Sequence, residues 1–278
     1  MTIDSNKKYI SVFVLDTPIS HDIYAEFGDF GDQGIELMKR SQFYDQEEIY
    51  FKRFDVIGKI ELPDLGDAEQ VKDLEKNCLG IYLTGSRSDS FTDEEWILRL
   101  SKFLREVLEK DDIKLPIVGI CFGHQIIGRI LGYKIGRNLK GWEIGATVVQ
   151  LGKKFQEVIG ELDSRQELVI NESHQDVVFK ELDGEGSKNI EANDFTIIGT
   201  SEICSNQGFI SEKKKVLTFQ GHPEFSKGFI LKSLYEKLEK KEIDEDVIKQ
   251  ALESTELLKN DNLLIADLIV KFFLDNSK

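Results

Sequence analysis

The chain has 278 residues, of which 40% are hydrophobic and 31% are charged, and its formal net charge is −15. This balance is typical of a globular protein with a sizeable core and excludes a disordered chain. The acidic charge argues against nucleic acid or an anionic membrane as the main partner, because phosphate contacts need clustered lysine and arginine. A small molecule is the expected partner.

The cysteines and the apolar segments indicate where the protein resides. Cys78, Cys121 and Cys204 are an odd number without disulfide or zinc spacing, which favours a reducing compartment. Residues 1–8 lack the apolar core of a signal peptide. The most apolar segment, residues 263–274, is interrupted by charges and is too short to span a bilayer. We expect a cytoplasmic protein without a membrane span, a metal or a cofactor.

Apolar runs alternate with helical patterns in the first half of the chain. The runs expected to be strands are residues 9–15, 50–60, 79–84 and 116–120. Helical patterns cover residues 34–39, 92–108 and 123–131, and the second opens with a capping box that has Thr92 as N-cap and Glu95 at N3. This alternation predicts a mostly parallel open sheet between two helical layers, with ligands beyond the carboxyl ends of the strands.

Shorter apolar runs separated by polar turns fill the region that follows. They are residues 144–151, 167–171, 195–200 and 216–220. They predict an antiparallel or mixed extension of the sheet. Helical patterns then cover residues 228–238, 244–258 and 261–274. We expect one α/β domain over residues 1–225, with residues 226–278 packed on it as a helical extension.

The sequence PIVGICFGHQ at residues 116–125 has the pattern of a nucleophile elbow. Gly119 and Gly123 flank Cys121 where so tight a strand-to-helix turn leaves no room for Cβ atoms. The helix behind the cysteine directs backbone N–H groups and a partial positive charge at the sulfur, which favours the thiolate. A small buried cysteine in an ordinary turn is the alternative. The two glycines after an apolar run favour a nucleophilic Cys121.

A nucleophilic thiol needs a base and a third group that orients the base. His222 is favoured because it follows a short strand across a turn, and Glu224 projects to the same side of the extended segment. An isolated His-Pro-Glu is more simply a loop ion pair, but with the elbow it is expected to be functional. The other histidines are expected on a polar loop (His21), beneath the site (His124) and along the pocket (His174).

Three motifs stand in a characteristic order: GICFGHQ at residues 119–125, SHQD at 173–176 and QGHPE at 220–224. In order and spacing they resemble the class I (triad) glutamine amidotransferase superfamily, over about residues 9–230. The resemblance implies a flavodoxin-like fold, a triad of Cys121, His222 and Glu224, and a γ-glutamyl thioester as intermediate. The other implied site residues are an oxyanion hole at Gly85, Ser86 and the backbone N–H of Phe122, and substrate contacts from Gln125, Ser173, His174 and Asp176.

The chain departs from many amidotransferases at residues 84–89 (TGSRSD), where they carry a Pro-Gly-Gly type loop. It also shows no nucleotide-binding segment. The GSRSD sequence of this loop, residues 24–30 and the C-terminal helices resemble the stand-alone subgroup, similar to the amidotransferase half of GMP synthase, that includes plant γ-glutamyl peptidases. The first hypothesis is therefore a stand-alone hydrolase of glutamine or a γ-glutamyl peptide, with Arg87 and Trp142 on the leaving-group side. The alternatives are a glutaminase subunit that delivers ammonia to a synthetase partner, and a non-catalytic regulatory or binding protein.

Overall fold

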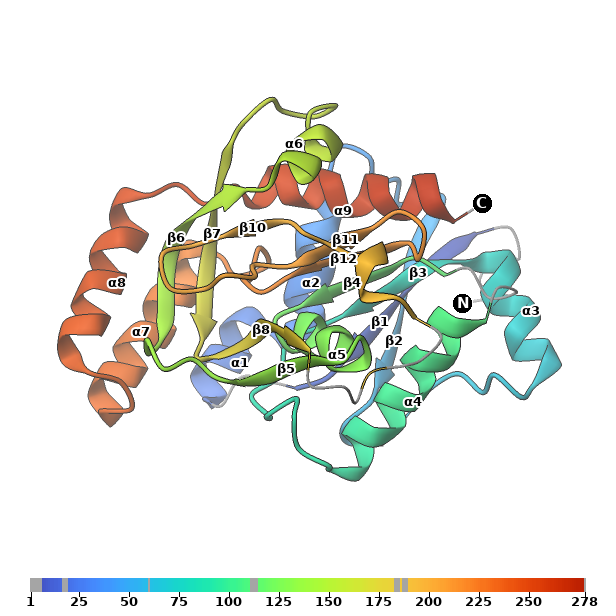
Figure 1. The fold of residues 1–278 in the computed structure, drawn as a ribbon, viewed down its shortest axis with the longest axis horizontal. Helices are drawn as coiled ribbons and strands as arrows, with labels where there is room; N and C mark the ends of the chain where they lie inside the picture. Colours follow the sequence, from blue (N-terminus) through green and yellow to red (C-terminus); the bar gives the residue numbers. More distant parts are fainter. Residues whose placement is uncertain are drawn as a thin grey trace.

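A seven-stranded sheet forms the centre of the molecule (Figure 1). The computed structural model describes residues 7–16, 20–59, 61–110, 115–182, 186 and 190–277. In sheet order the strands are β2 (Ile49–Asp55), β1 (Lys8–Val14), β3 (Cys78–Leu83), β4 (Ile117–Ile120), β12 (Val216–Phe219), β11 (Phe209–Ser211) and β9 (Thr196–Ile197). The first five are parallel, whereas β11 and β9 pair antiparallel at one edge. Over the described ranges, no helix has the length and hydropathy that crossing a bilayer requires.

Helices cover both faces of the central sheet. One face carries α2 (Phe30–Lys39), α6 (Lys153–Ile159) and α9 (Asn262–Asn276), and the other carries α3 (Ala68–Asn77), α4 (Glu95–Glu109) and α5 (Phe122–Ile130). Strand β1 shows why: Tyr9 and Phe13 join the core beneath α4 and α5, while Ile10 and Val12 join the core beneath α2 and α9. The predicted three-layer α/β fold with a mostly parallel sheet is confirmed.

Two small antiparallel sheets lie beside the central one. They contain β10 (Gly199–Thr200), β6 (Glu143–Leu151) and β7 (Glu167–His174) in one case, and β5 (Tyr133–Arg137) and β8 (Asp176–Leu182) in the other. The prediction that all the later runs extend the main sheet is thus wrong in part. β6 and β7 are long enough to satisfy each other's backbone groups over eight residue pairs, and β12 pairs in parallel with β4 inside the main sheet.

The C-terminal helices pack on two different parts of the molecule. α7 (Lys227–Lys240) and α8 (Glu245–Leu257) contact each other and β6, and α1 (His21–Phe27) contacts α7. α9 lies across the central sheet against α2 and β3 (Figure 1). We propose, as the sequence predicts, that residues 226–278 belong to the same folded unit as residues 1–225.

Three local predictions differ from the structure. The capping box at Thr92 is wrong, because its hydroxyl donates to the Asp89 carbonyl at 2.9 Å and Glu94 is the N-cap of α4. Strand β2 ends at Asp55, whose carboxylate accepts the Gly58 N–H in a turn; the predicted end, Ile60, lies outside the described residues. Helix α1 begins at His21, which was expected in a loop.

Candidate active site

Cys121 occupies the tight turn between β4 and α5. Its backbone has φ 49° and ψ −99°, an unfavourable conformation for a residue with a Cβ. A Cβ on Gly119 would lie 2.7 Å from the carbonyl carbon of Gly123, and a Cβ on Gly123 would lie 2.9 Å from the Cβ and 3.0 Å from the carbonyl oxygen of Leu83. The glycines of the elbow pattern are therefore sterically required. Backbone strain of this kind costs about 1–3 kcal/mol and persists where the surrounding structure enforces it.

His222 and Glu224 emerge beside the elbow because β12 is the neighbour of β4. The two strands run in parallel with Phe219 opposite Ile120, so the segments that follow them leave the same edge of the sheet. The Nδ1 atom of His222 lies 2.8 Å from Oε1 of Glu224. The His222 ring also stacks on Phe225, with centroids 4.0 Å apart and an interplanar angle of 4°.

The imidazole of His222 is electrostatically tuned toward its charged form. It is buried, which by itself disfavours the imidazolium, but the charges of Glu224 and Cys121 outweigh burial and raise the pKa of His222 to about 10. The interaction with Cys121 includes a side-chain hydrogen bond. The structure thus brings together the thiol, the imidazole and the carboxylate that the sequence singles out.

The Gly85 loop closes over the thiol and the imidazole. A Cβ on Gly85 would lie 2.8 Å from Cε1 of His222 and 3.6 Å from Cβ of Cys121. The loop is held by Asp16, which accepts from the Arg87 backbone N–H at 3.0 Å and from its guanidinium at 3.0 and 3.1 Å. On the other flank, the Phe122 N–H lies in the first turn of α5, where backbone donors have no intrahelical acceptor. The Gly85 loop and the first turn of α5 therefore both lie beside Cys121.

Replacing Gly85 by alanine is expected to reduce turnover by about 10- to 100-fold without unfolding the protein. The added methyl group would have to displace the His222 ring, and misplacing a reacting group by about 1 Å costs on this order. Steady-state kinetics with a γ-glutamyl substrate would measure the loss. Gly136→Ala is the matched control, because its Cβ would meet only Phe179, at an ordinary 3.7 Å. Unchanged turnover in Gly85→Ala would contradict the tight packing of this loop on the ring.

A cavity of about 360 Å³ opens beside Cys121 and His222. Gln125 lines it and donates through Nε2 to the Asp176 carbonyl at 3.1 Å and to Oε1 of Gln220 at 3.3 Å. The other predicted site residues that line the cavity are Ser86, Ser173, His174 and Asp176. Arg87 and Trp142, which are expected on the leaving-group side, line it as well. The volume lies in the range of small-molecule sites. Phe122 contributes only its backbone here, because its ring stacks on Trp96.

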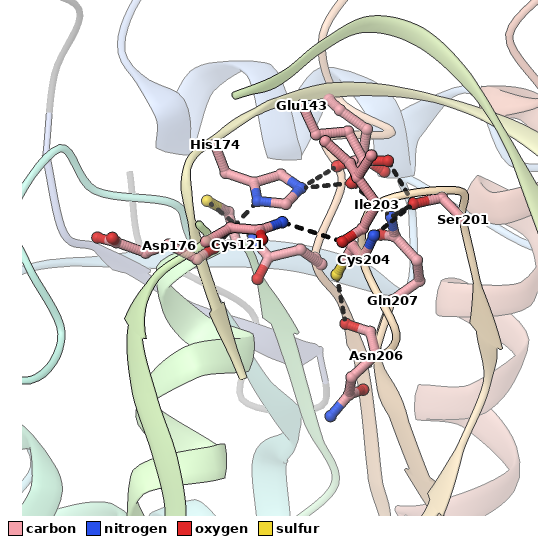
Figure 2. A network of polar contacts seen from close by, with 12 residues as sticks. Cys121, Glu143, His174, Asp176, Ser201, Ile203, Cys204, Asn206 and Gln207 are labelled. Atoms are coloured by element: carbon pink, nitrogen blue, oxygen red, sulfur yellow. Dashed lines mark hydrogen bonds and ion pairs between the residues drawn. The ribbon is translucent and has the colours of Figure 1, made fainter. Parts of the chain in front are cut away.

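His174 borders the cavity, but its ring is bonded within the protein (Figure 2). Its Nε2 lies 3.1 Å from Glu143 and 3.2 Å from Glu172, and its Nδ1 lies 3.0 Å from the Asp176 carbonyl. Burial opposes the imidazolium, yet the two carboxylates raise the pKa of His174 well above its ordinary value. Burial also raises the pKa of Glu172 to about 7. With both ring nitrogens engaged, His174 is placed to support the cavity wall, and its predicted position near the substrate head group stays a prediction.

The same cluster has the donor set of a metal site. The nearest ligand atoms of Glu143, Glu172 and His174 lie within 4.8 Å of one another. To bind His174, a divalent cation would have to displace a proton from its ring. With that proton in place, the His174 imidazolium already offsets the negative charge of the neighbouring carboxylates. Glu143 is further satisfied by Ser201 and by Gln207, whose Nε2 donates at 2.8 Å. We therefore assign the cluster a structural role.

The two remaining histidines lie away from the reacting groups. His124 is fully buried beneath the elbow, its Nδ1 lies 2.9 Å from the Thr218 hydroxyl, and burial lowers its pKa to about 3. It is neutral and packs under the site, in line with the prediction. His21 is exposed next to Asp22.

A family model described as "Glutamine amidotransferase class-I" matches residues 61–238. The chain belongs to this family. It is 35% identical over 237 residues to the YLR126C protein of Saccharomyces cerevisiae, which is classed by name with the glutamine amidotransferases; the match covers 84% of this chain and 86% of the yeast protein. It is 33% identical over 199 residues to gamma-glutamyl peptidase 2 of Arabidopsis thaliana, covering 70% of this chain and 73% of the plant protein. The resemblance on which the sequence prediction rests is thereby confirmed.

The fold agrees with this family membership. The crystal structure of a glutamine amidotransferase from Thermotoga maritima superposes with a TM-score of 0.64 at 20% identity, covering 97% of this chain and 99% of that chain. At this identity the likeness shows the shared amidotransferase fold alone.

Several residues of the amidotransferase site are not singled out by the sequence. Gln220 stands in the QGHPE motif, and its Nε2 lies 3.6 Å from Sγ of Cys121. Phe225, which stacks on His222, follows directly after that motif. Asp16, at the end of β1, carries a weaker signal, because it is a polar residue just past the carboxyl end of a buried strand. Glu143 and Lys237 carry no local signal and are found only from the structure.

Proposed function

We propose that this amidotransferase-family chain is a cysteine hydrolase of γ-glutamyl amide bonds. Cys121 is the nucleophile, His222 is the general acid and base, and Glu224 orients and charges the imidazole. The observation that supports this most strongly is the contact of Cys121 with a buried His222 that is itself paired to Glu224 at 2.8 Å. The 33% identity to a plant protein named as a γ-glutamyl peptidase supports a hydrolase.

The proposed reaction needs only these residues and water. The Cys121 thiolate attacks the γ-carbonyl carbon, a C–S bond forms, and the carbonyl electron pair moves to oxygen. N–H groups of Phe122 and the Gly85 loop stabilise this oxyanion; one such donor contributes about 3 kcal/mol. The C–N bond then breaks as the His222 imidazolium protonates the leaving amine. Water, deprotonated by His222, attacks the thioester, and breakage of the C–S bond releases glutamate and restores the thiolate.

The decisive experiment combines a substrate screen with covalent labelling. Purified protein is given glutamine and several γ-glutamyl dipeptides, and glutamate release is measured. In parallel, a glutamine-analogue alkylator is added and the modified residue is identified by peptide mass spectrometry. We expect glutamate from at least one substrate, with the label on Cys121. Absence of both would reject the proposal.

Two other outcomes would indicate the alternative functions. Weak glutaminase activity that rises sharply when a co-purifying synthetase is added would indicate an ammonia-delivering subunit. Thermal stabilisation by a γ-glutamyl compound without any product, unchanged in Cys121→Ala, would indicate a regulatory or binding protein on the same fold.

A further inference from the structure

The cleft beside Cys121 continues into a second hollow beneath α7. The main cavity has a volume of about 360 Å³ and the second about 90 Å³. The two hollows adjoin, because they share the lining residues Phe30, Arg87, Ser173, Phe225, Lys237 and Glu242. Glutamine ends at its amide nitrogen, whereas a γ-glutamyl peptide extends beyond it. The main cavity and the hollow that adjoins it therefore offer room for a leaving group larger than ammonia.

The arginines that line the main cavity are already paired. The guanidinium of Arg87 donates to both carboxylate oxygens of Asp16, at 3.0 and 3.1 Å. Arg137 donates to both oxygens of Asp89, at 2.9 and 3.0 Å, and lies 2.5 Å from Asp176. The Arg137 group offers a cation and two carboxylates on one wall, which is the complement of a zwitterionic α-amino acid head group.

Lys237 is the cavity cation whose charge is least compensated. Its nearest carboxylate oxygen, on Glu242, is 3.7 Å away, beyond hydrogen-bond distance, and its Nζ lies 5.2 Å from the centre of the Trp142 ring. Among the described residues, no hydrogen-bond acceptor lies within reach of Nζ, although only 18% of the side chain is exposed. Burial lowers the pKa of Lys237, and the opposing effect of the Glu242 carboxylate does not restore it. Glu236 also lines the second hollow and pairs with Lys240 at 3.7 Å, so what Lys237 offers a ligand there is unfilled hydrogen-bond donors and not excess charge.

We propose that Lys237 forms an anion subsite for a carboxylate on the leaving part of the substrate. This inference rests on the proposed hydrolysis of γ-glutamyl amides and narrows its substrate class to γ-glutamyl amino acids and peptides. The γ-glutamyl head group needs charges of both signs, which the Arg137 wall supplies. Lys237 faces one carboxylate, Glu242, at 3.7 Å without a hydrogen bond, adjoins the second hollow, and lies beside Trp142, whose ring lines the cavity where the leaving group would pass.

The test compares γ-glutamylglycine with γ-glutamylglycinamide, which differ only in the carboxylate of the leaving group. Wild-type protein is expected to hydrolyse the acid with a kcat/KM at least tenfold higher. Lys237→Met is expected to lower kcat/KM for the acid by about 10- to 100-fold and to change that for the amide by less than about twofold. Lys237→Arg is expected to keep the preference for the acid. Lys227→Met is the matched control, because Lys227 begins the same helix but pairs with Glu256 outside the cleft.

Hydrolysis of the neutral amide substrate shows whether a variant is folded and can carry out the reaction, because this substrate has no carboxylate for the subsite to bind. Equal losses on both substrates in Lys237→Met would place Lys237 at the head group or in the fold and overturn the inference. Hydrolysis of both substrates by wild type without a preference for the acid would overturn it as well, while leaving the proposed function intact. Failure of wild type to hydrolyse either substrate or any other γ-glutamyl amide would remove both.

Discussion

Replacing Cys121 by alanine is expected to abolish hydrolysis of every γ-glutamyl substrate, by at least about 10⁴-fold in kcat. Among the described residues, the Cys121 thiol is the group that we propose forms the thioester, since its turn is enforced by Gly119 and Gly123 and its side chain contacts His222. In this variant water would have to attack the amide directly. The oxyanion donors would still be in place, but the covalent step would be lost. The remaining rate should therefore be small but above the uncatalysed one. Glutamate release over long incubations would measure it.

The control for this variant is Cys78→Ala. Cys78 is also a buried free cysteine, but it stands at the amino end of β3, hydrogen-bonded to Ser11 and away from the cleft. Its replacement should leave kcat and labelling of Cys121 unchanged, apart from a modest loss of stability. Cys121→Ala is not expected to relieve the backbone strain of the positive φ at residue 121, because alanine, like cysteine, carries a Cβ. Residual activity within tenfold of wild type in Cys121→Ala would exclude Cys121 as the nucleophile.

The elbow was predictable because its chemistry is local. Glycine at both positions around Cys121 is a steric requirement of the turn itself, so the glycine spacing in the sequence predicts the geometry of the turn. The pairing of His222 with Glu224 was predictable for the same reason, as one residue in an extended segment separates them. Their approach to the thiol depends on β12 pairing with β4, a contact between residues about 100 positions apart, and no local signal in the sequence indicates it.

The wrong prediction at Thr92 and the unforeseen ion pairs of His174 have the opposite cause. The Thr92 hydroxyl has the right spacing for a cap, but a competing turn to Asp89 satisfies it. His174 stands in the SHQD motif, and Glu143 on the partner strand β6 and Glu172 on its own strand hold its ring in a buried ion-pair cluster. In both cases a non-local or alternative partner takes up the polar group. Lys237 shows the same limit, because only the packing of α7 brings it to the cleft.

Replacing Glu224 by glutamine is expected to lower kcat/KM by about 10³- to 10⁴-fold, as does the loss of the equivalent charge in other triads. The amide would keep the shape but not the charge that, with Cys121, raises the pKa of His222 to about 10 against the opposing effect of burial. The wild-type enzyme needs the imidazolium to protonate the leaving amine, so its activity should fall as pH rises through about 10. In Glu224→Gln that basic limb should shift to lower pH.

The same raised pKa links this pair to stability. A histidine whose pKa is raised on folding stabilises the protein fully below its unfolded pKa of about 6.5, and this contribution is lost as pH rises through about 10. Urea denaturation should therefore show Glu224→Gln destabilised relative to wild type at pH 6, with the difference shrinking toward pH 10. Glu239→Gln, an exposed change on α7, should show neither the kinetic nor the pH effect. If the activity of Glu224→Gln fell at the same basic pH as that of wild type, the Glu224 carboxylate would not control the charge of His222. Another group would then have to account for the raised pKa of His222.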